Sequence, residues 1–176
     1  MNLDLLNKLL AASANFALIV GVVVAIIGVI VATQTFKETE KTASAVLVLK
    51  LRDTLESDQF KKITDEVQDN GPSHALLKDE GGKFREIDIE NYIGNFEDIG
   101  YLVQESVVIE QMAYDHFSYD VEKAWCNADV QRVVGGAQKA DRSITAAVDP
   151  IYGNFEKLAK TYLSKEHRSC KDLANQ

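Results

Sequence analysis

The chain has 176 residues and a formal net charge of −8 at pH 7, and 46% of its residues are hydrophobic. This length accommodates one small domain and an additional segment. The acidic charge is a poor match for nucleic acid, so we expect no nucleic-acid partner. The excess of negative charge lies in residues 37–176, because residues 1–36 contain only Asp4 and Lys8 as charged side chains.

The first element is a long apolar segment between Lys8 and Lys37, an interval without charged residues. Its centre, residues 16–32, contains twelve Phe, Leu, Ile and Val residues, which favour membrane insertion by about 4–7 kcal/mol. With its flanks the segment covers residues 11–34, enough to cross the ~30 Å hydrocarbon core of a bilayer. We therefore predict a transmembrane helix over 11–34, after a short N-terminal tail over 1–10. The apolar run is longer than that of a signal peptide, and a buried core helix is rarely apolar on all sides.

Small residues recur along one side of this segment at intervals of three or four. They are Ala14, Ala17, Gly21, Ala25, Gly28, Ala32 and Thr35. At 100° per residue they form one stripe opposite a face of Val and Ile. Small residues allow two helix backbones to approach closely within lipid. The stripe predicts a helix–helix interface with another membrane protein or a second copy of the chain, in addition to contact with membrane lipid.

The charges that flank the segment bear on its orientation. Lys37, Lys41, Lys50 and Arg52 follow it closely, whereas Lys8 and the terminal amine precede it. Under the positive-inside rule this distribution favours a single-pass protein of the inner (plasma) membrane with its C-terminal domain in the cytoplasm.

Membrane-proximal helices are expected over residues 35–70. Residues 37–56 contain no helix breaker and carry an apolar side, and Ser57 is a candidate N-cap for a helix over 58–69. The apolar side consists of Val46, Leu47, Leu49, Leu51 and Leu55. Gly and Pro residues then indicate a loop over 70–83.

Residues 84–168 read as a helical bundle, followed by a C-terminal tail over 169–176. Apolar residues at helical spacing predict a helix over 89–103. Ser106 is a candidate cap for the helix that follows it, and a further helix is expected after Ser118. Gly135-Gly136 should end or loosen that helix, and Pro150 should start the last one. Strand alternation is not convincing anywhere in the chain. The predicted fold class is all-α, with one transmembrane helix followed by a small helical bundle.

Residues able to carry chemistry are scattered. We expect Glu97 to form a structural polar contact that orients a neighbouring helix, and Trp125 to lie at the edge of an aromatic core with its N–H finding a partner. The nearest approach to a metal site is His116 with Asp120 and Cys126, and its spacing is poor. Phosphate loops and nucleophile motifs are absent from the sequence. We therefore expect no catalytic residues, no metal and no cofactor, and a chain that is not an enzyme.

The two cysteines, Cys126 and Cys170, form neither a disulfide framework nor a zinc pattern. We interpret them as reduced thiols. A bridge between them would require a domain that faces an oxidising compartment.

Two segments carry a resemblance to a known family. Residues 95–103 read NFEDIGYLV, and a second helix runs from Tyr114 and Phe117 to Ala124-Trp125. With residues 49–63 and the apolar segment before them, they resemble the domain-of-unknown-function family 4760 over roughly residues 16–165. Ala124 stands where the pattern usually has an aromatic residue. The resemblance implies a membrane helix followed by a helical domain and assigns no activity.

Two functions follow from these observations. The first is a membrane-anchored interaction module, either an accessory subunit or a small oligomer assembled through the transmembrane helix. The alternative is a membrane-tethered sensor or effector whose helical domain binds a signal.

Overall fold

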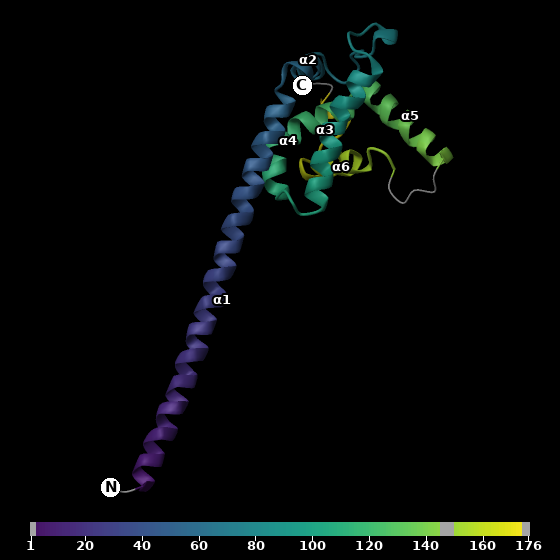
Figure 1. The fold of residues 1–176 in the computed structure, drawn as a ribbon. Coiled ribbons are helices and arrows are strands. Elements are labelled where there is room, and N and C mark those ends of the chain that lie inside the picture. The colour runs from purple at the N-terminus through teal and green to yellow at the C-terminus, as the bar shows by residue number, and fades with distance from the viewer. Residues whose placement is uncertain (1–2, 145–149, 174–176) are drawn as a thin grey trace. The chain divides into compact units, whose positions relative to one another are not determined.

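The computed structural model describes the backbone of residues 3–144 and 150–173, and the side chains of residues 25–69, 71–142 and 150–173. Within these ranges the regular structure is helical, which confirms the predicted all-α class. In chain order (Figure 1) the elements are α1 (Leu3–Leu55), α2 (Asp58–Asn70), the 3₁₀ helix η1 (Lys78–Glu80), α3 (Glu86–Gln104), α4 (Glu110–Cys126), α5 (Ala128–Ile144), α6 (Gly153–Lys165) and α7 (Cys170–Leu173).

The chain divides into two compact units, residues 1–43 and 44–176. The described part of the first unit, residues 3–43, belongs to the long helix α1, in which residues 25–43 are exposed. Hydroxyl groups of Thr35, Thr39 and Thr42 donate to the carbonyl oxygen four residues earlier in the helix. No helix in the described part of the chain is long and apolar enough to span a bilayer. Residues 11–24 of the predicted transmembrane segment lie outside the side chains that the structure describes.

The last turns of α1 belong to the second unit. Ser44, Val48 and Leu55 are buried there, and the Ser44 hydroxyl accepts a hydrogen bond from the backbone N–H of Ile109, 2.9 Å away. The predicted apolar side is correct in part: Leu55 is buried and Leu47 and Leu51 pack against the core. Val46 and Leu49 were wrongly included, because they are more than half exposed. Residues 44, 48 and 55 recur at intervals of one and two helical turns, which aligns them on one face.

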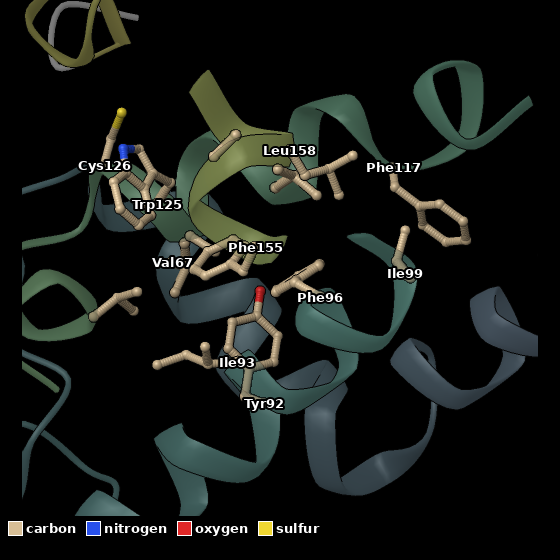
Figure 2. Close-up of a cluster of buried hydrophobic side chains, with 14 of the residues drawn as sticks. Val67, Tyr92, Ile93, Phe96, Ile99, Phe117, Trp125, Cys126, Phe155 and Leu158 are labelled. Atoms are coloured by element: carbon tan, nitrogen blue, oxygen red, sulfur yellow. The ribbon is translucent and has the colours of Figure 1, made fainter. Parts of the chain in front are cut away.

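The core of the second unit is an aromatic cluster that joins α3, α4 and α6 (Figure 2). Phe96 stacks on Phe155 with ring centroids 5.4 Å apart, Tyr92 meets Phe96 edge-on at 5.0 Å, and Trp125 meets Phe155 edge-on at 5.4 Å. The predicted core face of α3 is confirmed, since Ile89, Ile93 and Ile99 are also fully buried.

Helices α3 and α6 approach closely at Gly100. A Cβ atom at this position would lie 2.6 Å from the backbone oxygen of Asn154, which is closer than side-chain atoms normally come. Gly100 is therefore the position at which α3 lets the start of α6 pack against it, and that contact fixes where α6 begins on the bundle.

The segment between α2 and α3 is held by side chains at the start of α5. The Asp129 carboxylate accepts hydrogen bonds from the backbone N–H groups of Leu76 and Leu77, at 2.7 and 2.8 Å. The Asn127 side chain donates to the carbonyl oxygen of His74 and accepts from the N–H groups of Asp129 and Val130. Asn127 thereby caps α5 and anchors the preceding loop together with Asp129.

The predicted start of α2 after Ser57 is confirmed, but the boundaries predicted for the later helices differ from the structure. Ser106 has a positive φ of 56° in the turn after α3 and does not cap α4. Ser118 lies inside α4, which continues to Cys126.

Gly135 and Gly136 also lie inside a helix, since α5 continues to Ile144. Helix α6 begins at Gly153 rather than directly after Pro150, because Tyr152 adopts a left-handed conformation with φ of 61°. Finally, the segment interpreted as a C-terminal tail contains α7, whose Leu173 is buried.

Candidate functional site

Four residues of the predicted small-residue stripe lie among the described side chains, and all four are exposed. They are Ala25, Gly28, Ala32 and Thr35. A Cβ atom at Gly28 would meet nothing within 4 Å, so the helix backbone is open to close approach there. Ala14, Ala17 and Gly21 lie outside the described side chains.

Large apolar side chains surround the described part of the stripe and are at least half exposed. They are Ile26, Ile27, Val29, Ile30, Val31 and Phe36. Soluble proteins rarely leave a contiguous apolar surface of this kind uncovered unless it is an interaction site. Residues 25–36 of α1, which we call the apolar segment, are therefore one candidate interface.

Glu97 lies on α3 and binds the N-terminus of α6. Its Oε1 accepts hydrogen bonds from the Asn154 side-chain Nδ2 at 2.7 Å and the Asn154 backbone N–H at 3.3 Å, and its Oε2 accepts from the Phe155 backbone N–H at 2.7 Å. The first N–H groups of a helix have no partner within that helix and carry partial positive charge. Glu97 therefore acts as a cap supplied by a neighbouring helix.

Trp125 lies in the core at the same end of α6. Its ring packs edge-on against Phe155, and its backbone carbonyl accepts a hydrogen bond from the Gln131 side chain at 2.7 Å. Glu97 and Trp125 thus meet at Phe155, one through the backbone and the other through the ring. Both contacts position α6.

The side chains weighed as a metal site are engaged elsewhere. Cys126 is bonded to Cys170, and Asp120 accepts a hydrogen bond from the Arg52 guanidinium at 2.7 Å and one from Gln68 at 2.5 Å. Burial raises the pKa of the Asp120 carboxyl, against the opposing charge of Arg52. Among the described residues no group of three or more metal-binding side chains occurs.

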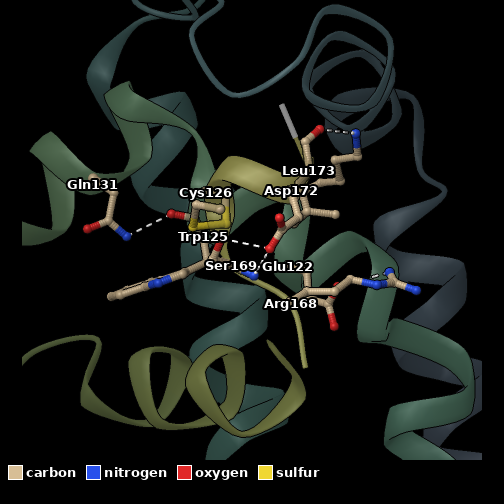
Figure 3. The surroundings of a disulfide bond; sticks show 10 residues. Glu122, Trp125, Cys126, Gln131, Arg168, Ser169, Asp172 and Leu173 are labelled. Atoms are coloured by element: carbon tan, nitrogen blue, oxygen red, sulfur yellow. Dashed lines mark hydrogen bonds and ion pairs between the residues drawn. A yellow bond between two sulfur atoms is a disulfide. The ribbon is translucent and has the colours of Figure 1, made fainter. Parts of the chain in front are cut away.

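The Cys126–Cys170 disulfide joins α4 to α7 (Figure 3). The interpretation of two reduced thiols was therefore wrong. Sequence separation gave no indication of this pairing, because the two residues are 44 positions apart and only the packing of α7 against α4 brings them together.

Glu122 lies one turn before Cys126 on α4 and is 1% exposed. Neither of its carboxylate oxygens has a hydrogen-bond partner among the described residues. The nearest cation is the Arg168 guanidinium, 3.6 Å away. Burial raises the pKa of the Glu122 carboxyl, and the Arg168 charge opposes that change only in part. No sequence signal marked this residue, because a glutamate within a helix is normally solvated.

The described surface of the second unit includes two hollows of note. One of about 200 Å³ is lined by Gly100, Val103, Glu110, Leu158 and Tyr162, among others. The Tyr162 hydroxyl is buried and has no hydrogen-bond partner among the described residues. The other hollow, of about 350 Å³, lies beside Arg52, Lys61, Thr64 and Gln68.

Comparison with known proteins gives one match. The sequence model of the family described as Domain of unknown function (DUF4760) matches residues 15–162. No curated protein and no solved structure matches the chain.

Proposed function

The chain belongs to the DUF4760 family, and we propose that it is a single-pass, membrane-anchored interaction module of the plasma membrane. In this proposal residues 11–34 cross the bilayer. The chain assembles through that helix, either as an accessory subunit of another membrane protein or as a small oligomer. The proposal assigns the chain no catalytic role.

The observation that carries the proposal is the exposure of the apolar segment. Ile26, Ile27, Val29, Ile30 and Val31 are each more than half exposed on one continuous helix. Covering such a side chain contributes about 1.5–3 kcal/mol, so leaving five of them in water is costly. Lipid around the helix, or a second helix against it, would remove that cost.

The small-residue stripe supports assembly within the membrane rather than simple anchoring. Lipid tails are as apolar as Val and Ile, so helices associate in lipid through close packing and not through a hydrophobic drive. The open backbone at Gly28, with Ala25 and Ala32 on the same side, provides a surface for such packing. The partner is a second copy or another membrane protein with a matching surface.

A membrane-tethered sensor is the second candidate, and the hollow beside Tyr162 favours it. The hollow has a volume of about 200 Å³ and is lined by Val103 of α3, Glu110 of α4 and Leu158 of α6, among others. A small ligand bound there would therefore contact three helices of the bundle at once. The domain would then report the ligand to the membrane partner.

The test is the native mass of the full-length chain extracted in a gentle detergent, together with whatever protein co-purifies. We expect a discrete oligomer or a partner in fixed ratio, and we expect Gly28→Ile to abolish it because the isoleucine holds the helices apart. Ile30→Phe is the matched control, since it adds bulk on the opposite face. Association that survives Gly28→Ile as well as it survives Ile30→Phe would contradict assembly through the stripe.

A further inference from the structure

We infer that the globular unit, residues 44–176, faces an oxidising compartment, on the side of the membrane away from the cytoplasm. The inference rests on the membrane anchor proposed above. It reverses the orientation that the flanking charges favour. The Cys126–Cys170 disulfide and the contacts of the C-terminal strap, defined as residues 166–173, carry the argument.

Little of the strap is buried against the bundle. Helix α7 has four residues, of which Leu173 alone is buried. The backbone N–H groups of residues 166–168 donate to carbonyl oxygens in the last turn of α6. Lys123 Nζ also donates to the Leu173 carbonyl at a long 3.4 Å, and Arg168 faces Glu122. The hydrogen bonds between Ser169 and Asp172 are internal to the strap and do not attach it.

The strap covers a costly part of α4. Figure 3 shows Arg168, Ser169, Asp172 and Leu173 gathered around Glu122 and Cys126. The Glu122 carboxylate beneath them has no hydrogen bond among the described residues, and burying a charged group without one is unfavourable.

Without the disulfide, the strap would have to order its backbone and exclude water from Glu122. In return it would have one buried leucine, one long hydrogen bond, the ion pair of Arg168 with Glu122 and the backbone bonds that extend α6. The disulfide adds the covalent link between α4 and α7.

The bond forms only where an oxidant is present. Two cysteine thiols lose two protons and two electrons to the disulfide of an oxidising partner, which is itself reduced to two thiols, and the new S–S bond joins α4 to α7. Cytosolic reductants keep such pairs as thiols, whereas disulfides persist in the periplasm, the secretory pathway and outside the cell.

The structure also weakens the case for the cytoplasm. Arg52 forms ion pairs with Asp120 and Glu56 inside the globular unit, and Lys50 lies in the same folded segment. Long loops and domains cross membranes largely regardless of their charge. Without these two residues, Lys37 and Lys41 stand against Lys8 and the terminal amine, an even count that does not oppose the disulfide.

The test uses the full-length chain in intact cells and has two readouts. In the first, free thiols are blocked with N-ethylmaleimide after acid quenching, the protein is reduced, and a maleimide-linked polymer then counts the thiols released. We expect two labels on each wild-type chain. No label after reduction would mean that both cysteines had been free in the cell, and would overturn the inference.

The second readout is Ser73→Cys, which adds one thiol at an exposed loop position and leaves the disulfide in place. A membrane-impermeant maleimide should label this variant in intact cells with a permeable outer envelope, while a cytoplasmic thiol protein in the same cells stays unlabelled. Labelling only after lysis would place the domain in the cytoplasm and refute the inference.

Carbonate extraction of the same cells separates this failure from failure of the anchor. A chain released by carbonate is not an integral membrane protein, which contradicts the proposed function. In that case the number of labels from the first readout still decides whether the domain lies in an oxidising compartment.

Discussion

Replacing Glu97 by alanine tests how α6 is fixed on the bundle. The substitution removes three hydrogen bonds at once, to the Asn154 side chain, the Asn154 backbone and the Phe155 backbone. Loss of an N-terminal cap costs about 0.5–2 kcal/mol, and a hydrogen bond to a charged group contributes about 1.5–3 kcal/mol. The bonds share one carboxylate, and water replaces part of what they provide because Glu97 is half-buried. We therefore expect Glu97→Ala to lower the free energy of unfolding by about 2–3 kcal/mol.

For a chain of this size the loss corresponds to a fall in Tm of roughly 4–12 °C. The assay is thermal unfolding of the full-length protein in mild detergent, followed by the fluorescence of Trp125. This is the only tryptophan in the chain, and it packs on Phe155 at the affected site. Glu97→Gln should lower the free energy of unfolding by about half as much. The amide oxygen of the glutamine can still accept one hydrogen bond, but its NH2 group would face a backbone N–H of α6, and two donors cannot bond to each other.

The matched control for this series is Asp98→Asn. Asp98 is the next residue of α3, and it is exposed, so neutralising it should leave Tm nearly unchanged. If Glu97→Ala unfolds at the same temperature as Asp98→Asn, the carboxylate does not hold α6, and the reasoning from these three hydrogen bonds fails.

Three further predictions concern the same unit. Gly100→Ala should cost about 1–3 kcal/mol, because its Cβ would lie 2.6 Å from the backbone of α6. Gly94→Ala, with nothing within 4 Å, should be neutral or stabilising, and urea unfolding of the pair distinguishes them. Glu122→Gln should be more stable than wild type at pH 7. Burial raises the folded-state pKa of Glu122 above 4.5, so the folded wild type binds that proton more tightly than the unfolded chain. The stability difference between Glu122→Gln and wild type should therefore shrink as the pH falls from 7 towards 4.5. A difference that grows instead would contradict this sign. Reducing the Cys126–Cys170 bond, which spans 44 residues, should destabilise the unit by about 4 kcal/mol. Urea unfolding with and without a dithiol measures this loss. The variant with both cysteines replaced by alanine should unfold at the same urea concentration in either case.

The parts of the fold that sequence predicts well depend on local periodicity. The core face of α3 is an example, because Ile89, Tyr92, Ile93, Phe96 and Ile99 recur at helical spacing and are all fully buried. The start of α2 is another, since the helix begins directly after Ser57 as predicted, although the Ser57 side chain forms no capping hydrogen bond. Neither prediction needs information from distant residues.

The boundaries that sequence reasoning missed depend on distant partners. The N–H group of Ile109, the residue before α4, donates to the Ser44 hydroxyl, 65 positions earlier, so a contact with α1 is made where α4 starts, and Ser106 does not cap it. Gly135 and Gly136 remain helical because the Val133 and Val134 beside them are buried in the core, and this packing outweighs the low helix propensity of glycine. Propensity indicates where a helix end is favourable, but tertiary packing decides whether the chain ends there.

The same distinction separates the two polar residues on which the candidate sites depend. Glu97 could be expected to form a contact because it lies next to the buried face of a well-predicted helix, although its partners on α6 could not be named. Glu122 could not be anticipated, because its burial exists only while the strap covers it and the strap is held by a bond between residues 44 positions apart. Near Glu97 the helices are held by hydrogen bonds that any compartment permits. Near Glu122 the fold is held by a bond that only an oxidising compartment provides, so the stability of the end of α4 should follow the redox state of its surroundings while the contact between α3 and α6 should not.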